Sequence, residues 1–229
     1  MGYDNELSDA VVLDLETVAA PQCETFLDPV RAPSTYKDPA KIASYCAEKL
    51  TERVEKAGLE PDLCEIVAVG WRHPEKEGTA TVYTRADVDE AGLLEMTWEA
   101  IHGRRIVGFN IFSFDLPVLI RRSQLLGLRV PSVNLDRYRS PHIDLLERLT
   151  FQGKLTYRSL AFYTRRFGVP CVDETSGKDI AQMVAVSDWE GVRSHCRSDI
   201  DKTTALAHRL GWLTDLVPAK AGAEVAEVL

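Results

Sequence analysis

Short apolar runs separated by polar turns predict a sheet in the first half of the chain. The expected strands cover residues 11–17, 65–71, 79–84 and 105–110. The first run begins Val11-Val12-Leu13, and an unbroken apolar run of this kind is typical of a strand buried on both faces. A linker of hairpin length joins the second and third strands, so we expect these two to pair antiparallel.

Apolar positions at helical spacing predict six helices, four of which lie in the second half of the chain. The expected helices cover residues 38–58, 87–102, 114–126, 143–149, 159–167 and 188–210. The first of them starts at Asp38-Pro39, an N-cap followed by a proline at the first helical position, and stops at Gly58. Strands come first, helices follow, and the sheet contains a hairpin. The expected fold class is therefore α/β, a mixed β-sheet flanked by α-helices.

The length of 229 residues fits a single domain. We expect this domain to span residues 1–217, with an insertion at about 20–62 and a C-terminal tail at 218–229. No apolar run approaches the ~20 residues of a membrane span, and the N-terminus lacks the pattern of a signal peptide. We therefore expect no membrane partner. The five cysteines are scattered, which favours reduced thiols and a cytoplasmic location.

The net charge of −8 conceals an uneven distribution along the chain. Residues 1–100 sum to −12, residues 101–169 to +8, and the remainder to −4. A basic middle segment in an acidic chain could be a surface that contacts phosphates. The alternative is that its lysines and arginines occupy the outer faces of helices, and charge alone does not separate the two interpretations.

Two carboxylates follow the apolar start of the first strand. Asp14 and Glu16 are two residues apart, and this spacing places both side chains on one side of a strand. Two like charges at a buried position are costly unless a cation lies between them. Because the ligands are oxygens, a hard divalent ion such as Mg²⁺ is the expected partner.

A third acid, Asp115, follows the fourth strand and stands in the first turn of an expected helix. The helix dipole favours an Asp there whatever its function. The neighbouring aromatic residues, among them Phe114, indicate a partly dry setting, and exposed rings at such a rim could stack on unpaired bases.

The last candidate is the pair His195 and Asp199 in the final helix. Residues four apart share one helix face, and a histidine beside a carboxylate is suited to accept a proton from water. The alternative is an ordinary ion pair on the helix surface.

Taken together, these stretches resemble the DEDD superfamily of 3′–5′ exonucleases, which has a ribonuclease-H-like fold. That family shows Asp-x-Glu on the first strand, an Asp after an Asn-containing stretch, and a last Asp on a late helix. The matching residues here are Asp14, Glu16, Asp115 preceded by Asn110, and Asp199. The chain is most similar to the branch that includes the proofreading domain of family B DNA polymerases and its stand-alone relatives.

The resemblance implies two-metal-ion phosphodiester hydrolysis at the 3′ ends of single-stranded DNA or RNA, with DNA favoured. Two Mg²⁺ or Mn²⁺ ions would lie ~3.5–4 Å apart. Asp14 would bridge them, Glu16 and Asp199 would complete one site, and Asp115 would support the second. The implied substrate contacts are Thr17, Asn110, Phe114, Arg121, Arg122 and Lys178, with Arg165 and Arg166 as further candidates for the strand backbone. A separate polymerase, or replication or repair factors, would be the protein partners.

The last motif departs from both branches of the family. One branch carries Tyr with three residues before the Asp, and the other carries His with four. This chain has His195 with three residues before Asp199. We therefore predict that His195 replaces the family tyrosine in orienting the attacking water, and its role as a full general base stays open.

Three other functions are compatible with parts of the pattern. A catalytically weak nucleic-acid-binding module on the same fold would have no need of four acids. A zinc hydrolase using His195 and Asp199 would lack a second histidine at ligand spacing. A protein-interaction domain would leave the acid set and the charge distribution as coincidences.

Overall fold

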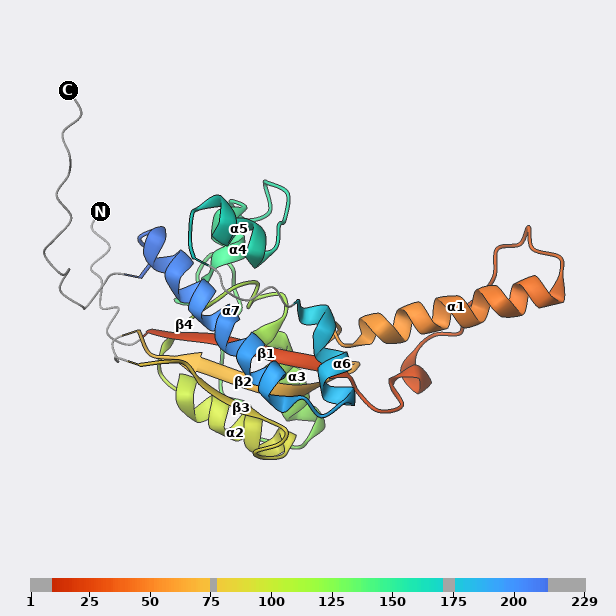
Figure 1. Cartoon of the computed structure of the whole chain (residues 1–229), viewed down its shortest axis with the longest axis horizontal. Coiled ribbons are helices and arrows are strands. Elements are labelled where there is room, and N and C mark those ends of the chain that lie inside the picture. Colours follow the sequence, from red (N-terminus) through yellow and green to blue (C-terminus); the bar gives the residue numbers. More distant parts are fainter. Residues whose placement is uncertain (1–9, 75–77, 171–175, 214–229) are drawn as a thin grey trace, which may run out of the picture.

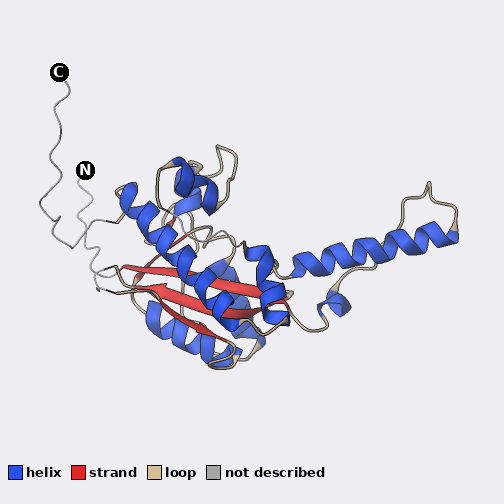
Figure 2. Ribbon diagram, in the orientation of Figure 1, coloured by secondary structure: helices blue, strands red, loops and turns tan. Residues whose placement is uncertain are grey.

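The computed structural model describes residues 10–74, 78–170 and 176–213, and its centre is a five-stranded mixed sheet (Figures 1 and 2). The strands are β1 (Ala10–Ala19), β2 (Cys64–Arg72), β3 (Thr81–Thr84), β4 (Arg105–Gly108) and β5 (Ile143–Asp144). Their order across the sheet is β3-β2-β1-β4-β5. β2 runs antiparallel to β1 and β3, whereas β4 runs parallel to β1 and β5. This arrangement confirms the expected ribonuclease-H-like α/β fold.

Helices cover both faces of the sheet. They are α1 (Pro39–Ala57), α2 (Glu90–Ile101), α3 (Asp115–Leu125), α4 (Leu145–Leu149), α5 (Leu160–Arg166), α6 (Ile180–Ala185) and α7 (Trp189–Arg209), with short 3₁₀ helices η2 (Cys23–Phe26) and η3 (Gly177–Asp179). α6 and α7 pack on one face of β1, and α2 and α3 pack on the other face (Figure 1). α5 lies against α7.

The burial of β1 on both faces explains its continuous apolar sequence. Val11, Leu13 and Leu15 belong to the cluster that packs under α2 and α3. Val12 belongs to the cluster under α7. Since side chains alternate along a strand, Asp14 shares the side of Val12 and faces α7. The packing of these apolar side chains therefore determines that Asp14 lies on the face of the sheet that α7 covers.

The segment between β1 and β2, residues 20–62, forms an arm that contains η2 and α1. Figure 1 shows α1 projecting away from the sheet. Asp38 caps α1 by accepting a hydrogen bond from the Ala40 backbone N–H at 2.9 Å, with proline at the first helical position as expected. At its base, the Ala20 N–H donates to the Leu63 carbonyl at 2.8 Å, so the arm leaves and rejoins the sheet at neighbouring positions.

Two short elements were not expected from the sequence. The expected helix 143–149 begins only at Leu145, because Ile143 and Asp144 pair with β4 as the fifth strand. α6 is six residues long, too short for a helical period to be detected. The expected tail at 218–229 lies outside the described residues. None of the helices within the described ranges combines the length and apolar character needed to cross a membrane.

Candidate active site

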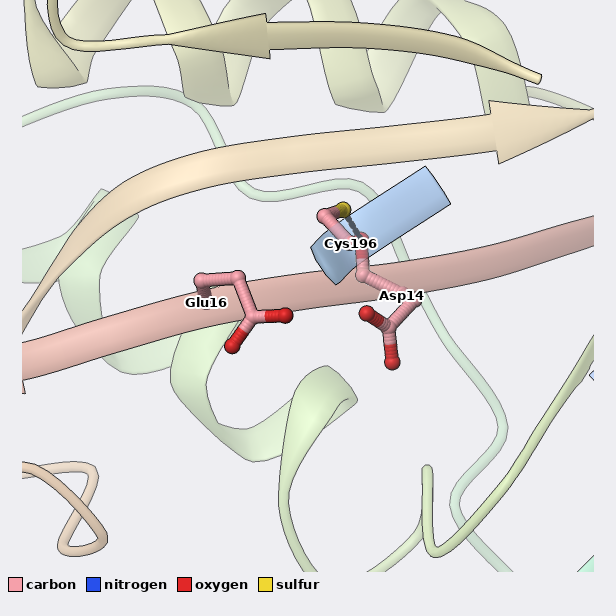
Figure 3. A group of neighbouring side chains, drawn as sticks. All are labelled: Asp14, Glu16 and Cys196. Carbon is pink, nitrogen blue, oxygen red and sulfur yellow. Dashed lines mark hydrogen bonds between the residues drawn. The ribbon is translucent and has the colours of Figure 1, made fainter. Parts of the chain in front are cut away.

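Asp14 and Glu16 lie side by side on the middle strand, and Figure 3 shows their carboxylates on the same side of β1. Asp14, Glu16 and Cys196 of α7 each present a potential ligand atom, and these atoms all lie within 4.8 Å of one another. Glu16 is only 8% exposed. The register with β2 shifts directly after Glu16, so a bulge follows the second acid. The strand thus supplies two carboxylates where α7 covers the sheet.

α7 places His195 and Asp199 one turn apart beside these acids. His195 Nε2 lies 3.8 Å from Glu16 Oε1 and 3.9 Å from Asp199 Oδ2. The histidine is 4% exposed. Lys202, one turn further along α7, donates to Asp199 Oδ1 at 2.8 Å and is also buried. The imidazole therefore lies between two carboxylates that come from different elements.

Asp115 is the first residue of α3 and is 3% exposed. Burial raises the pKa of its carboxyl to about 8, and the nearby charge of Asp144 contributes in the same direction. Hydrogen bonds from the backbone of Asp115 and Leu15 offset part of this rise. The contact with Leu15 places Asp115 against β1, next to Asp14.

The pKa of Asp14 links the four acids into one group. Burial raises the pKa of this carboxyl well above its ordinary value, and the charges of Glu16, Asp199 and Asp115 raise it further, in that order. The structure therefore brings together all four carboxylates that the sequence motifs identified.

Asp144 holds the chain segment that leads to Asp115. Its carboxylate is 1% exposed and accepts four backbone hydrogen bonds. Two come from the loop after β4, from Asn110 and Phe112 at 3.0 Å each. The other two come from the first turn of α4, from Leu146 at 2.9 Å and Glu147 at 3.3 Å. Asp144 thus caps α4 and fixes the loop before α3 at the same time.

The donor set fits hard divalent cations. Asp14, Glu16, Asp115 and Asp199 supply oxygen ligands of the kind that Mg²⁺ and Mn²⁺ prefer. Lys202 neutralises part of the charge of Asp199. The pKa of Asp14 is nevertheless raised by the other acids as well as by burial. The four carboxylates therefore retain excess negative charge that a bound cation would compensate. Burial raises the pKa of the Cys196 thiol well above its ordinary value. A protonated thiol is a poor metal ligand. The thiol points to the backbone of Asp14, with Sγ 3.9 Å from the Asp14 carbonyl oxygen (Figure 3).

A family model described as a predicted 3′–5′ exonuclease related to the exonuclease domain of PolB matches residues 59–227. The chain belongs to this exonuclease family. The match includes Asp115, His195 and Asp199 and begins near the end of the arm, so that Asp14 and Glu16 lie outside it. The resemblance inferred from the motifs is confirmed by this match.

Among solved structures, the chain is similar to a family B DNA polymerase from the hyperthermophilic archaeon Pyrobaculum calidifontis. The TM-score is 0.55 at 16% sequence identity, and the match covers 92% of this chain and 25% of the polymerase chain. This exonuclease-family chain therefore shares its fold with one part of a longer protein. No curated protein sequence matches the chain.

The residues predicted to contact substrate lie in different parts of the fold. Asn110 and Phe114 belong to the loop between β4 and Asp115, where Asn110 has a left-handed backbone with φ 67°. Lys178 is exposed in η3. Thr17 donates its hydroxyl to the Gly58 carbonyl at 2.5 Å and so ties β1 to the base of the arm.

The two arginines of α3 are engaged within the fold. Arg121 Nε lies 2.6 Å from Asp62 at the surface. Arg122 forms a two-point ion pair with Glu90 of α2, at 2.7 and 2.6 Å, and its side chain is 12% exposed. Glu90 also accepts the Ile66 N–H of β2 at 2.8 Å. The Arg122 guanidinium thus joins α3 to α2 and, through Glu90, to β2, and its contact with a nucleic-acid strand stays a prediction.

Sequence reasoning missed two residues next to the acids. Lys202 stands three positions after Asp199, which is helical contact spacing, but a lysine at that spacing is common on solvated helices. Asp144 was interpreted mainly as a residue at a helix N-terminus, with a supporting role beside the catalytic residues as the less favoured alternative. Its second function depends on hydrogen bonds to Asn110 and Phe112, more than thirty positions earlier in the chain.

Proposed function

We propose that this protein is a metal-dependent 3′–5′ exonuclease that removes nucleotides from the ends of single-stranded nucleic acid, with DNA as the favoured substrate. The observation that carries the proposal is that three acids, Glu16, Asp115 and Asp199, surround Asp14, whose pKa is raised by burial and by these three charges. A phosphodiester is itself an anion, so an acidic cluster engages it only through bound cations.

Asp14, Glu16, Asp115 and Asp199 would hold two Mg²⁺ or Mn²⁺ ions, which supply positive charge to the attacking and leaving oxygens. β1 and α7 fix the positions of three of these acids, and the loop braced by Asp144 fixes the fourth. Ligands on regular elements with buried surroundings keep a defined geometry.

His195 would orient the attacking water. Its Nε2 lies between the carboxylates of Glu16 and Asp199, where a water held by these acids would meet the imidazole. In this position it takes the place of the family tyrosine. Accepting the proton that the water releases is a second role that this position of the imidazole allows.

The test is hydrolysis of a 5′-labelled single strand of DNA or RNA in Mg²⁺ or Mn²⁺, with and without EDTA. We expect a ladder that shortens from the 3′ end, that EDTA abolishes, and that Asp14→Asn abolishes. Asp201→Asn is the matched control, because Asp201 lies on α7 but pairs with Arg72 at 3.0 Å. Binding without any ladder would contradict the proposal in favour of a binding module, and cuts within a circular strand would contradict end specificity.

The assignment of His195 is tested with two substitutions. His195→Tyr is expected to retain activity and His195→Ala to lose it, because a phenol can also orient water by hydrogen bonding. Equal activity of the two variants would contradict the role of this side chain.

We further propose that residues 1–217 act as one exonuclease domain, with residues 20–62 as an insertion and 218–229 as a tail. A separate polymerase, or replication or repair factors, would supply the ends on which it acts. A cytoplasmic location is supported by the free thiols of Cys23, Cys46, Cys64 and Cys196.

A further inference from the structure

The connection from α4 to α5 and the exposed side of α5 carry positive charge without negative charge. Residues 148–170 contain five lysines and arginines and no aspartate or glutamate, in a chain with a net charge of −8. All five are exposed: they are Arg148, Lys154, Arg158, Arg165 and Arg166. Part of the basic middle of the sequence therefore gathers on one exposed segment.

Large apolar side chains are interleaved with these cations. Phe151 is 64% exposed, Leu155 54%, Tyr157 52% and Phe162 39%. The Arg158 guanidinium lies over the Phe162 ring, 5.6 Å from its centroid. Single exposed apolar residues are common on protein surfaces, but a group of them within one short segment marks a contact site. We call Phe151, Lys154, Leu155, Tyr157, Arg158 and Phe162 the α4–α5 surface.

The fold holds this segment in place with its side chains outward. The Gln152 N–H donates to the Glu147 carbonyl at 2.6 Å, and the Leu155 N–H donates to the Thr150 carbonyl at 3.0 Å. Phe151 has φ 52°, a left-handed conformation that is unfavourable for an aromatic residue. The backbone is thus fixed in a strained shape that leaves the Phe151 ring in solvent.

The α4–α5 surface is connected to the active site through three contacts. Asp144 caps α4 and also binds the loop that leads to Asp115. Tyr163 of α5 packs against Phe109 in the same loop, with ring centroids 6.2 Å apart. α5 also packs on α7, the helix that carries His195 (Figure 1). The surface therefore belongs to the same rigid frame as the catalytic acids.

We propose that the α4–α5 surface binds the single strand whose 3′ end enters the active site. Rings of Phe151, Tyr157 and Phe162 stack on unpaired bases, and Lys154 and Arg158 contact the phosphates. Every base has a flat face, so stacking with nearby cations gives affinity without sequence preference. The inference rests on the proposed function, since it names the surface that receives that substrate.

The stacking part is tested by binding of a fluorescently labelled twenty-nucleotide oligo(dT) in EDTA, where no hydrolysis occurs. Phe151→Ala with Phe162→Ala is expected to weaken binding by at least about fivefold, from the usual contribution of one stacked base. Phe26→Ala is the matched control, because Phe26 is 78% exposed on η2 of the arm and is not part of the α4–α5 surface. This control is expected to bind like the wild type.

The charge part is tested by the dependence of binding on salt. On a single strand, the slope of log K against log salt is about 0.7 for each phosphate that a lysine or arginine neutralises. Lys154→Gln with Arg158→Gln removes two such cations and should therefore reduce the slope by about 1.4. Lys37→Gln with Lys41→Gln removes two exposed lysines of the arm and should leave the slope unchanged.

Hydrolysis of thymidine 5′-p-nitrophenyl phosphate separates this inference from the proposed function. This ester occupies the active site without reaching a distant surface, so all four variants should hydrolyse it like the wild type. If the wild type binds the oligonucleotide and the α4–α5 variants bind it equally well, the inference is overturned and the surface contacts a protein instead. Absence of wild-type binding also overturns it. Weaker binding by these variants supports the inference, even if hydrolysis fails and the proposed function falls.

Discussion

Substitution of Asp144 should damage stability and catalysis together, to a degree that depends on the replacement. Asp144→Ala removes the N-cap of α4, worth about 1 kcal/mol. It also leaves the N–H groups of Asn110 and Phe112 without their acceptor, at about 1–3 kcal/mol each when buried. The expected loss is about 3–7 kcal/mol, a large part of the ~5–15 kcal/mol by which domains are stable.

Asp144→Asn should be much milder. Oδ1 accepts the bonds from Asn110, Leu146 and Glu147, and an asparagine oxygen can keep this position. Only the bond from Phe112 to Oδ2 is removed, for about 1–3 kcal/mol. Burial raises the pKa of Asp144, which means that the fold bears a cost for this charge, and asparagine removes that cost.

Urea unfolding at neutral pH in EDTA measures both free energies, and the exonuclease assay shows whether the Asp115 loop is displaced. Asp136→Ala is the matched control, because Asp136 accepts comparable backbone bonds from Tyr138 and Arg139 at 2.9 Å in an exposed turn. It should cost less than about 1 kcal/mol. Equal losses for Asp144→Asn and Asp144→Ala, or a loss below about 1 kcal/mol for Ala, would refute this account of the carboxylate.

Three further substitutions or conditions follow from the packing and the charges. Gly70→Ala would place a Cβ 2.5 Å from Ile200 Cδ1, so we expect α7 to shift, a loss of about 1–3 kcal/mol in urea unfolding, and reduced activity. Arg122→Met leaves Glu90 buried without its cation and should cost about 3–5 kcal/mol, whereas replacing both partners with Met should restore much of that stability in the same unfolding measurement. In the folded state the Asp115 carboxyl keeps its proton up to a pH of about 8. In the unfolded chain the same carboxyl loses its proton at about pH 4. The folded state binds more protons between these limits, so thermal melts in EDTA should show stability falling as pH rises from about 4 to 8. Mg²⁺ affinity should rise over the same range, because binding releases this proton, and a pH-independent affinity would contradict the assignment.

The sequence was sufficient for four of the five strands and for the elements on which the four acids lie, because each of these depends on local pattern. The apolar run of β1 fixes a strand, and the two-residue spacing of Asp14 and Glu16 fixes their common side. The four-residue spacing of His195 and Asp199 likewise fixes a common helix face. Only the order of the motifs, through the family resemblance, related these elements to one another.

The remaining contacts depend on residues that are distant along the chain. Asp144 lies in the short strand β5 and also caps α4. Its hydrogen bonds to the loop after β4 cannot be predicted from the spacing of nearby residues. Arg122 was expected at a nucleic-acid strand as one of the substrate contacts that the family resemblance implies. Its partner Glu90 stands thirty-two positions away, and only the packing of α2 on α3 makes the pair.

The arm joins the sheet in a way that makes it separable from the rest of the chain. Ala19 pairs with Cys64 across β1 and β2, and the next bond, from the Ala20 N–H to the Leu63 carbonyl, closes the ladder before the arm begins. The strands therefore meet in the same register whether a short turn or a long excursion connects them. Each doubling of a flexible connection costs only ~0.6 kcal/mol in closure entropy. The strand that carries the acids can therefore keep its place in the sheet with arms of different lengths.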